Sequence, residues 1–405
     1  MKVPPRRLQH HRKNRGRFQR GVRREFLAKN ATGKAEPYVL VTGGAGFIGS
    51  NLADRLLSSG TPVLIFDNLS RPGAEKNLEW LSQVHGDRLR VEISDVRNFD
   101  AVSRGVRGAT AVFHFAAQVA VTSSVENPRE DFEINVGGTI NVLEAVRARA
   151  PQPRLVFTST NKVYGAMDDL LLTKDDQGYR PVSGQLHASG VDERRSLEFC
   201  TPYGCSKGAS DQYVLDYART FGVPATLFRM SCIYGPHQFG TEDQGWVAHF
   251  LLCAVARQPI TIYGDGLQVR DVLFVEDLVH AFLLAKDSPA TCGQAFNIGG
   301  GPSNALSLRR LVELISELQG FPCAVRHDEW RCGDQRHYVS DTHKFRNATG
   351  WSPRVGVREG VERLWRWLRE QSVALRRTGA NGNAVSDFER LPLSESAEAP
   401  SFRSS

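Results

Sequence analysis

Thr42-Gly-Gly-Ala-Gly-Phe-Ile-Gly49 is the most informative stretch of this chain for its fold, because it joins an apolar run to an amphipathic segment. Residues 38–42 (YVLVT) before it have the pattern of a buried strand, and the apolar residues after it recur at helical spacing. Gly43, Gly46 and Gly49 stand where side chains would obstruct the turn, the approach of a pyrophosphate and the packing of the helix. The stretch therefore predicts a dinucleotide site, with backbone N–H groups and the positive end of a helix facing the phosphates.

A carboxylate follows at the end of the second apolar run, about 20 residues further on. Asp67 at this position can accept hydrogen bonds from the hydroxyl groups of an adenosine ribose, and its charge repels a 2′-phosphate. NAD is therefore favoured over NADP, although Arg71 nearby is able to accommodate such a phosphate if it is not simply a solvated surface charge. Asp95 and Val96 end the third run and are expected beside the adenine, unless the aspartate only forms a turn.

Short apolar runs alternate with amphipathic segments along most of the chain, which is the signature of a parallel sheet with crossover helices. The expected strands are 38–42, 63–66, 89–93, 111–115, 154–158, 225–230 and 295–298. Together they predict an α/β protein with a Rossmann-like, doubly wound parallel sheet. After residue 230 the alternation loosens, and helical patterns at 308–319 and 357–375 indicate a smaller C-terminal lobe.

We therefore divide the chain into a nucleotide-binding domain at 37–230, whose sheet later segments complete, and a second lobe at 231–372. The remaining residues, 1–36 and 373–405, are expected to be disordered tails. Residues 1–36 hold 12 Lys and Arg against two acidic residues, so the rest of the chain is mildly acidic. The net charge of +7 thus gives no argument for a nucleic-acid-binding domain, although a basic arm can attract an anionic partner.

Composition narrows the class of protein. Hydrophobic residues make up 41% and charged residues 23% of the chain, which is typical of a folded globular protein and excludes a coiled coil. No run approaches the ~20 apolar residues that cross a bilayer. The seven cysteines show neither C-x-x-C nor any paired zinc spacing, which predicts free thiols in the cytoplasm and no metal site.

Tyr203-Gly-Cys-Ser-Lys207 places a phenol and an ammonium group four residues apart, on one face of a helix. Thr158-Ser-Thr160 stands at the C-terminal end of the strand predicted at 154–158, at the sheet edge where open α/β sheets bind ligands. We expect Lys207 to lower the pKa of the tyrosine and to hold a nicotinamide ribose. Tyr203 would then act as general base toward a hydroxyl group, and Thr160 would hydrogen-bond the same oxygen.

These residues resemble the extended short-chain dehydrogenase/reductases of the NAD-dependent epimerase/dehydratase family, over roughly residues 38–370. The motifs that carry the resemblance are TGGAGFIG (42–49), EINVGGT (133–139), TSTNKVYG (158–165), YGCSK (203–207) and a YGDG-x3-RDVLFVED block (263–277). The resemblance implies a bound NAD, a nucleotide-sugar substrate gripped by the C-terminal lobe, catalysis by Thr160, Tyr203 and Lys207, and a homo-oligomer built through helices.

The resemblance also implies a set of binding residues. Those expected to bind NAD, besides the catalytic tyrosine and lysine, are Gly43, Gly46, Phe47, Ile48, Gly49, Asp67, Asn68, Ser70, Asp95, Val96, Ala116, Gln118 and Asn135. Arg270 and Arg331 match the arginines that bind the substrate diphosphate, a task that suits bidentate guanidinium groups. Gln244 and Trp246 are candidates for contacts with the nucleotide or sugar, because Cys232 stands where many relatives place a diphosphate-binding asparagine.

The neighbours of Thr160 indicate the type of reaction. The 4,6-dehydratases of the family carry an acidic pair directly after this threonine, whereas this chain has Asn161-Lys162. Elimination of water would lack its acid and base, so an epimerase is favoured. The strings STNKVYG, TPYGCSKGASDQYVLDYAR (201–219) and RMSCIYGPHQFGTEDQGWVAHF (229–250) resemble the CDP-paratose 2-epimerase branch, which implies oxidation at C2.

Two alternatives remain open from the sequence. One is a 4-epimerase of the same family that acts on a UDP-sugar. The other is a non-catalytic member that keeps the dinucleotide site as a sensor or scaffold and binds an anionic partner through residues 1–36, although such a protein has no chemical need for all three catalytic groups.

Overall fold

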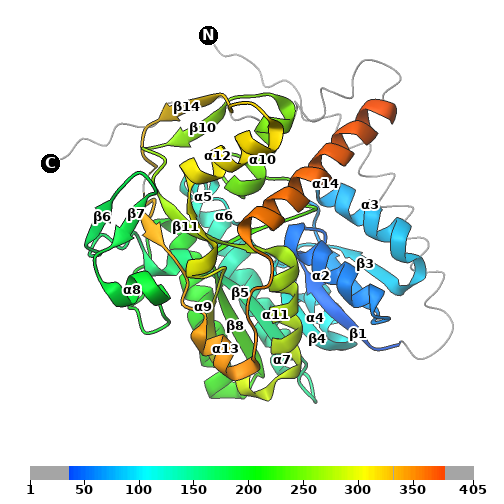
Figure 1. Ribbon diagram of the computed structural model, residues 1–405. Helices are drawn as coiled ribbons and strands as arrows, with labels where there is room; N and C mark the ends of the chain where they lie inside the picture. Colours follow the sequence, from blue (N-terminus) through cyan, green and yellow to red (C-terminus); the bar gives the residue numbers. More distant parts are fainter. Residues whose placement is uncertain (1–35, 332, 379–405) are drawn as a thin grey trace, which may run out of the picture.

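The computed structural model describes residues 36–331 and 333–378. At its centre lies a seven-stranded parallel sheet (Figure 1) with the strand order β12-β8-β5-β4-β1-β2-β3. Its strands are β1 Tyr38–Thr42, β2 Val63–Asp67, β3 Leu89–Ile93, β4 Ala109–His114, β5 Arg154–Thr160, β8 Ala225–Met230 and β12 Gln294–Ile298. All seven expected strands are present, and the order reverses at β1, where a doubly wound sheet forms its ligand-binding crevice.

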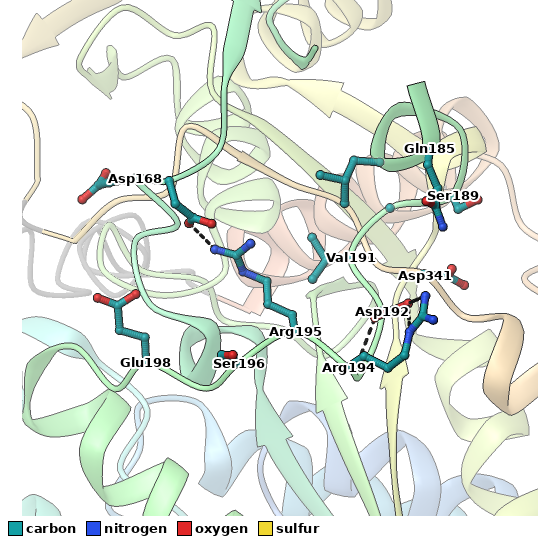
Figure 2. A pocket seen from close by; sticks show the side chains of 13 residues that line it. Asp168, Gln185, Ser189, Val191, Asp192, Arg194, Arg195, Ser196, Glu198 and Asp341 are labelled. Atoms are coloured by element: carbon teal, nitrogen blue, oxygen red, sulfur yellow. Dashed lines mark hydrogen bonds and ion pairs between the residues drawn. The ribbon is translucent and has the colours of Figure 1, made fainter. Parts of the chain in front are cut away.

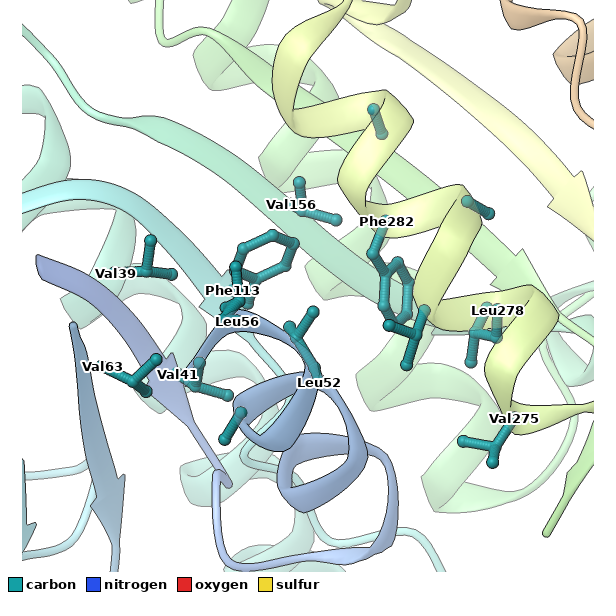
Figure 3. Close-up of a cluster of buried hydrophobic side chains, with 14 of the residues drawn as sticks. Val39, Val41, Leu52, Leu56, Val63, Phe113, Val156, Val275, Leu278 and Phe282 are labelled. Carbon is teal, nitrogen blue, oxygen red and sulfur yellow. The ribbon is translucent and has the colours of Figure 1, made fainter. Parts of the chain in front are cut away.

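Helices cover both faces of this sheet, because successive strand residues point to opposite sides and both sides are apolar. On one face Val39 and Val41 pack with helices α2 and α11, and Figure 3 shows Leu52, Leu56 and Phe282 reaching into this core. On the other face the core is formed with α4, α7 and α9. The bounds are α2 Phe47–Ser58, α3 Ala74–His85, α4 Phe99–Arg107, α7 Gly138–Arg147, α9 Thr201–Phe221 and α11 Val275–Asp287.

The residues that follow β8 build most of a second, smaller lobe with its own apolar core. Its helices are α10 Trp246–Ala256, α12 Leu308–Gln319 and α14 Val357–Thr378. Its strands are β9 Cys232–Tyr234, β10 Ile260–Tyr263, β11 Val269–Phe274, β13 Ala305–Ser307, β14 Val325–Asp328 and β15 His337–Tyr338. The expected helix at 308–319 is confirmed to the residue, and Ser307 caps it through a hydrogen bond from the Arg310 N–H group.

The remaining short elements connect these layers. They are α5 Val121–Glu126, α6 Pro128–Phe132, a π-helix at Glu133–Gly137, β6 Leu172–Lys174, β7 Tyr179–Pro181, α8 Gly184–Ser189 and α13 His343–Thr349. The two lobes alternate along the sequence. The chain forms β11 in the second lobe and then returns to the central sheet with α11 and β12. Helix α14 ends at Thr378, so residues 373–378 of the tail expected at 373–405 are helical. The rest of that tail, and all of the tail expected at 1–36 except residue 36, lie outside the described residues.

Candidate active site

A cavity of about 420 Å³ opens at the carboxyl ends of the central strands, between the two lobes. It is lined by most of the residues expected from the sequence: Gly43, Gly46, Phe47, Ile48, Gly49, Asp67, Asn68, Ser70, Asp95, Val96, Ala116, Gln118, Thr160, Tyr203, Lys207, Gln244 and Trp246. These residues come from several different connections, which the parallel sheet brings to one edge. The cavity is therefore the candidate active site.

The turn between β1 and α2 forms one wall of the cavity and fits a dinucleotide. Gly43 has a φ of +68°, and a Cβ atom there would lie 2.7 Å from the backbone nitrogen of Ala116. A Cβ atom on Gly49 would lie 2.3 Å from the carbonyl oxygen of Gly43. Gly46 precedes the helix in an extended conformation, and no side chain caps the first N–H groups of α2. Those free donors and the bare backbone suit a pyrophosphate.

Asp67 lies at the end of β2, beside this turn. Its Oδ2 atom accepts a hydrogen bond of 3.0 Å from the Ala45 N–H group, and its Oδ1 atom accepts one of 2.8 Å from Leu69. Burial raises the pKa of this carboxyl, while the N–H groups of Leu69, Ala45 and Gly46 lower it. The carboxylate thus holds the glycine turn in place as well as facing the cavity, and Asn68 is oriented by a 2.9 Å hydrogen bond to Asp95.

Thr160, Tyr203 and Lys207 meet at the other end of the cavity, from the end of β5 and the first turns of α9. Tyr203 and Lys207 are only 8% and 5% exposed. The Lys207 Nζ atom donates a hydrogen bond of 2.7 Å to the Thr158 carbonyl oxygen and lies 4.5 Å from the centre of the Phe157 ring. The lysine is therefore anchored to β5, the strand that also carries the threonine.

The ionisation of Tyr203 differs from the expectation. Burial raises the pKa of its phenol to about 12, the Thr160 hydroxyl lowers it, Asp131 raises it and Arg71 lowers it. In the described structure the cation that favours the phenolate is thus Arg71, which lines the cavity, and the expected lowering by Lys207 is not seen.

Three of the expected binding residues do not line the cavity. Asn135 lies behind it, where its side chain bonds to Gln118, Asp131 and Ser206. Arg270 donates a hydrogen bond of 2.7 Å to Asp334, and Arg331 lies over the Tyr263 ring at 3.9 Å and pairs with Asp243 at 3.3 Å.

Loop residues 235–245, between β9 and α10, line the cavity with Gln244, and Trp246 lines it from the first position of α10. The indole nitrogen of Trp246 has no hydrogen-bond partner among the described residues. Cys232 also lines the cavity, and burial raises the pKa of its thiol.

Long-range contacts hold this loop against the nucleotide-binding domain. The Asn77 side chain donates hydrogen bonds to the carbonyl oxygens of Ala45 and His237, at 3.1 and 3.2 Å. The His237 ring stacks on Trp80 with 3.6 Å between ring centres. His237 and Phe239 therefore line the cavity as parts of a strap over it, and no local pattern in the sequence indicates contacts between segments 160 residues apart.

A second hollow of about 670 Å³ lies outside this site, beside α8. Figure 2 shows Arg195 extending toward the segment of Asp168, whereas Arg194 lies against Asp192 on the other side of the hollow. Arg195 pairs with Asp169, and Arg194 donates a 2.7 Å hydrogen bond to Asp192. The charges of this hollow are thus partly paired internally, and none of the expected site residues lines it.

Comparison with known proteins identifies the family. The family model described as "NAD dependent epimerase/dehydratase family" matches residues 39–299. The chain belongs to this family. The CDP-paratose 2-epimerase of Salmonella typhi is 44% identical over 343 residues, which cover 81% of this chain and 98% of that protein. The UDP-glucose 4-epimerase of Mycolicibacterium smegmatis is 33% identical over 336 residues, with 82% and 99% covered.

Comparison with solved structures supports the same family. The UDP-glucose 4-epimerase of Thermus thermophilus, in complex with NAD, superimposes with a TM-score of 0.68 at 30% identity, covering 82% of this chain and 99% of that one. The predicted Rossmann-like fold, the NAD cofactor and the enzyme class, an NAD-dependent nucleotide-sugar epimerase, are confirmed at the level of the family. Within the described residues, every helix is too short or too polar to cross a membrane.

Proposed function

We propose that this protein is a CDP-paratose 2-epimerase that acts by transient oxidation at C2 of the sugar. The observation that carries the proposal is the 44% identity with the Salmonella typhi CDP-paratose 2-epimerase across nearly its whole length. The gathering of Thr160, Tyr203 and Lys207 in one cavity with the glycine turn supports it chemically.

The residues of the chain divide the work between binding and proton transfer. The turn at Gly43 to Gly49 and Asp67 would hold NAD, which would supply hydride transfer from and to the sugar carbon. Tyr203 removes the proton from the C2 hydroxyl group, and Thr160 donates a hydrogen bond to the same oxygen as it becomes a carbonyl. Lys207 holds the nicotinamide ribose.

Two residues beside the threonine support epimerisation over elimination of water. The Asn161 side chain donates a hydrogen bond of 3.2 Å to Gln335, and the Lys162 Nζ atom donates one of 3.3 Å to the Gly333 carbonyl oxygen. Neither side chain is a carboxylate and neither lines the cavity. An elimination would need an acid and a base at these positions.

The test is to incubate the purified protein with CDP-paratose carrying deuterium at C2 and to analyse the product by NMR and mass spectrometry. We expect an epimer at C2 that keeps the deuterium, because the same hydrogen returns to the same carbon. Loss of the deuterium to solvent would indicate proton abstraction and contradict the mechanism.

A UDP-sugar 4-epimerase is the second candidate, supported by the 33% identity with the Mycolicibacterium smegmatis enzyme. The same incubation with UDP-glucose separates the two functions. Conversion of UDP-glucose with no change to CDP-paratose would overturn the first proposal in favour of the second.

A further inference from the structure

The strap, residues 235–245, and the helix beside it present buried oxygen atoms to the cavity. Gln238 is 8% exposed and lines the cavity, and its Oε1 atom has no hydrogen-bond partner among the described residues. Asn77, on α3, is 2% exposed and lines the same cavity, and its Oδ1 atom is likewise unpartnered in the described structure. Such atoms are costly to bury, so a ligand is expected to bond here. Two acceptors suit the hydroxyl groups of a ribose.

The strap is joined at this point to the turn that receives the dinucleotide. The Nδ2 atom of Asn77 donates hydrogen bonds to the carbonyl oxygens of Ala45, in the glycine turn, and His237, in the strap, at 3.1 and 3.2 Å. The turn and the strap both line the cavity, and one amide group fixes the distance between them. A dinucleotide that lies on the turn therefore has the strap as its cover.

Two contacts outside the cavity hold successive residues of the strap. The Asn51 side chain, on α2, donates a hydrogen bond of 3.0 Å to the Pro236 carbonyl oxygen. The His237 ring stacks on Trp80 of α3, with 3.6 Å between the ring centres and 21° between the ring planes. Neither Asn51 nor Trp80 lines the cavity, so both hold the strap from behind.

The backbone of the strap is held in a conformation that it would not adopt freely. His237 has a φ of +67°, a left-handed value that costs free energy in a residue other than glycine and persists only where the surroundings impose it. The stacked ring and the hydrogen-bonded carbonyl group of His237 supply that constraint. Phe239 packs over Gly73, where an added Cβ atom would lie 2.1 Å from the phenyl ring. Loss of these contacts would therefore let the strap relax away from the turn.

We propose that Trp80 and Asn51 are positioning residues that hold the strap closed over bound NAD, so that the cofactor stays in the site between turnovers. When their contacts with His237 and Pro236 break, the strap opens and NAD leaves. A cover of this kind suits an epimerisation, because the hydride must return from the cofactor that took it. The inference needs only NAD, on which the family depends, and holds whichever nucleotide sugar the protein uses.

The experiment measures the rate at which NAD leaves the cofactor-loaded protein, while an excess of a second dehydrogenase and its substrate converts each released NAD to fluorescent NADH. Trp80→Leu removes the stacked ring but keeps an apolar side chain, and we expect it to release NAD about 10-fold faster. Trp80→Phe keeps an aromatic ring against His237 and should release NAD at nearly the unaltered rate. Trp330→Leu makes the same exchange in the second lobe, at a side chain that does not line the cavity, and should change nothing.

A variant on a different helix keeps the test valid if Trp80→Leu does not fold, which thermal melts report. Asn51→Ala removes the hydrogen bond to the Pro236 carbonyl oxygen and is compatible with the helix, so we expect release about 5-fold faster. Hydrogen exchange followed by mass spectrometry reports on the strap itself. The amides of residues 235–245 should exchange faster in both variants, while those of the central strands should not, which separates a loosened strap from a general loss of stability.

Three results would overturn the proposal. The first is NAD release at the unaltered rate from a variant whose strap exchanges faster, since the strap would then not govern retention. The second is unchanged exchange of the strap in both variants, since Trp80 and Asn51 would then not hold it closed. The third is equally fast release from Trp330→Leu. Failure of the unaltered protein to epimerise CDP-paratose would contradict the proposed function alone, because NAD release is measured without any sugar.

Discussion

Tyr203 and Lys207 are polar side chains whose ionisation is set by burial rather than by their ordinary chemistry. Burial disfavours both charged forms, raising the pKa of the phenol to about 12 and lowering that of the lysine to about 8. The neighbours that correct these shifts come from other elements and from the body of α9: Thr160 and Arg71 for the tyrosine, and the carboxylates of Asp131 and Asp211 for the lysine. The chemistry of the site is therefore a property of its surroundings.

Replacing Tyr203 by Phe tests the assigned base. Because the ring and its packing remain, we expect the protein to fold and to keep its NAD, while turnover falls by about 100-fold or more. Turnover is measured on CDP-paratose, and bound NAD is measured after denaturation. A rate near that of the unaltered protein would show that another group removes the proton.

Asp211 and Arg229 form a buried ion pair whose two side chains are 0% and 6% exposed. Asp211→Asn leaves the arginine charge buried and unpaired, so we expect the free energy of unfolding to fall by about 3–5 kcal/mol. Urea denaturation followed by circular dichroism measures this change. Asp216→Asn, at an exposed position of the same helix, is the control and should change it by less than about 0.5 kcal/mol.

Among the elements of the fold, the β1–α2 turn has the least room for change. Its backbone is folded so tightly that a Cβ atom on Gly49 would lie only 2.3 Å from the Gly43 carbonyl oxygen. The N-terminus of α2 is consequently aimed into the cavity with its N–H groups free of any side-chain cap. The loop at 235–245 closes over the same cavity and is held by side chains of α2 and α3, Asn51 and Asn77.

Gly49→Ala should therefore abolish NAD binding, because a methyl group 2.3 Å from the Gly43 carbonyl oxygen forces α2 away from the turn. Bound NAD is measured in the purified variant. Gly137→Ala is the matched control, since nothing lies within 4 Å of its added Cβ atom, and it should bind NAD normally. Normal binding by Gly49→Ala would mean that the turn tolerates displacement of the helix.

The molecule as a whole is held together by apolar cores on both faces of one sheet and by a third core in the second lobe. Phe282 lies in the first of these (Figure 3), with its ring centre 4.9 Å from that of Phe115 and 5.6 Å from that of Phe228. It joins α11 to the sheet beneath the cavity.

Phe282→Ala removes this contact and leaves a hole where α11 meets the sheet. We expect the free energy of unfolding to fall by about 3–5 kcal/mol, measured by urea denaturation. Phe99→Ala serves as the control, because that side chain is 45% exposed and should change stability far less. Similar losses for both variants would show that the cores do not dominate the stability.

Local pattern and spacing in the sequence were enough to predict the sheet and much of the site. Alternating buried runs indicate the seven strands, the glycines of TGGAGFIG indicate the turn, and Tyr203 and Lys207 share a face because they are four residues apart on a helix. Most of the residues expected at the site do line the cavity, because the carboxyl ends of parallel strands meet at one edge of the sheet.

Which groups from distant segments meet could be learned from the folded chain alone. The partners of Arg270 and Asn135 and the strap over the cavity depend on packing between elements far apart in the chain. Burial and nearby charge set the pKa of each buried group, and neither quantity exists until the chain has folded around it.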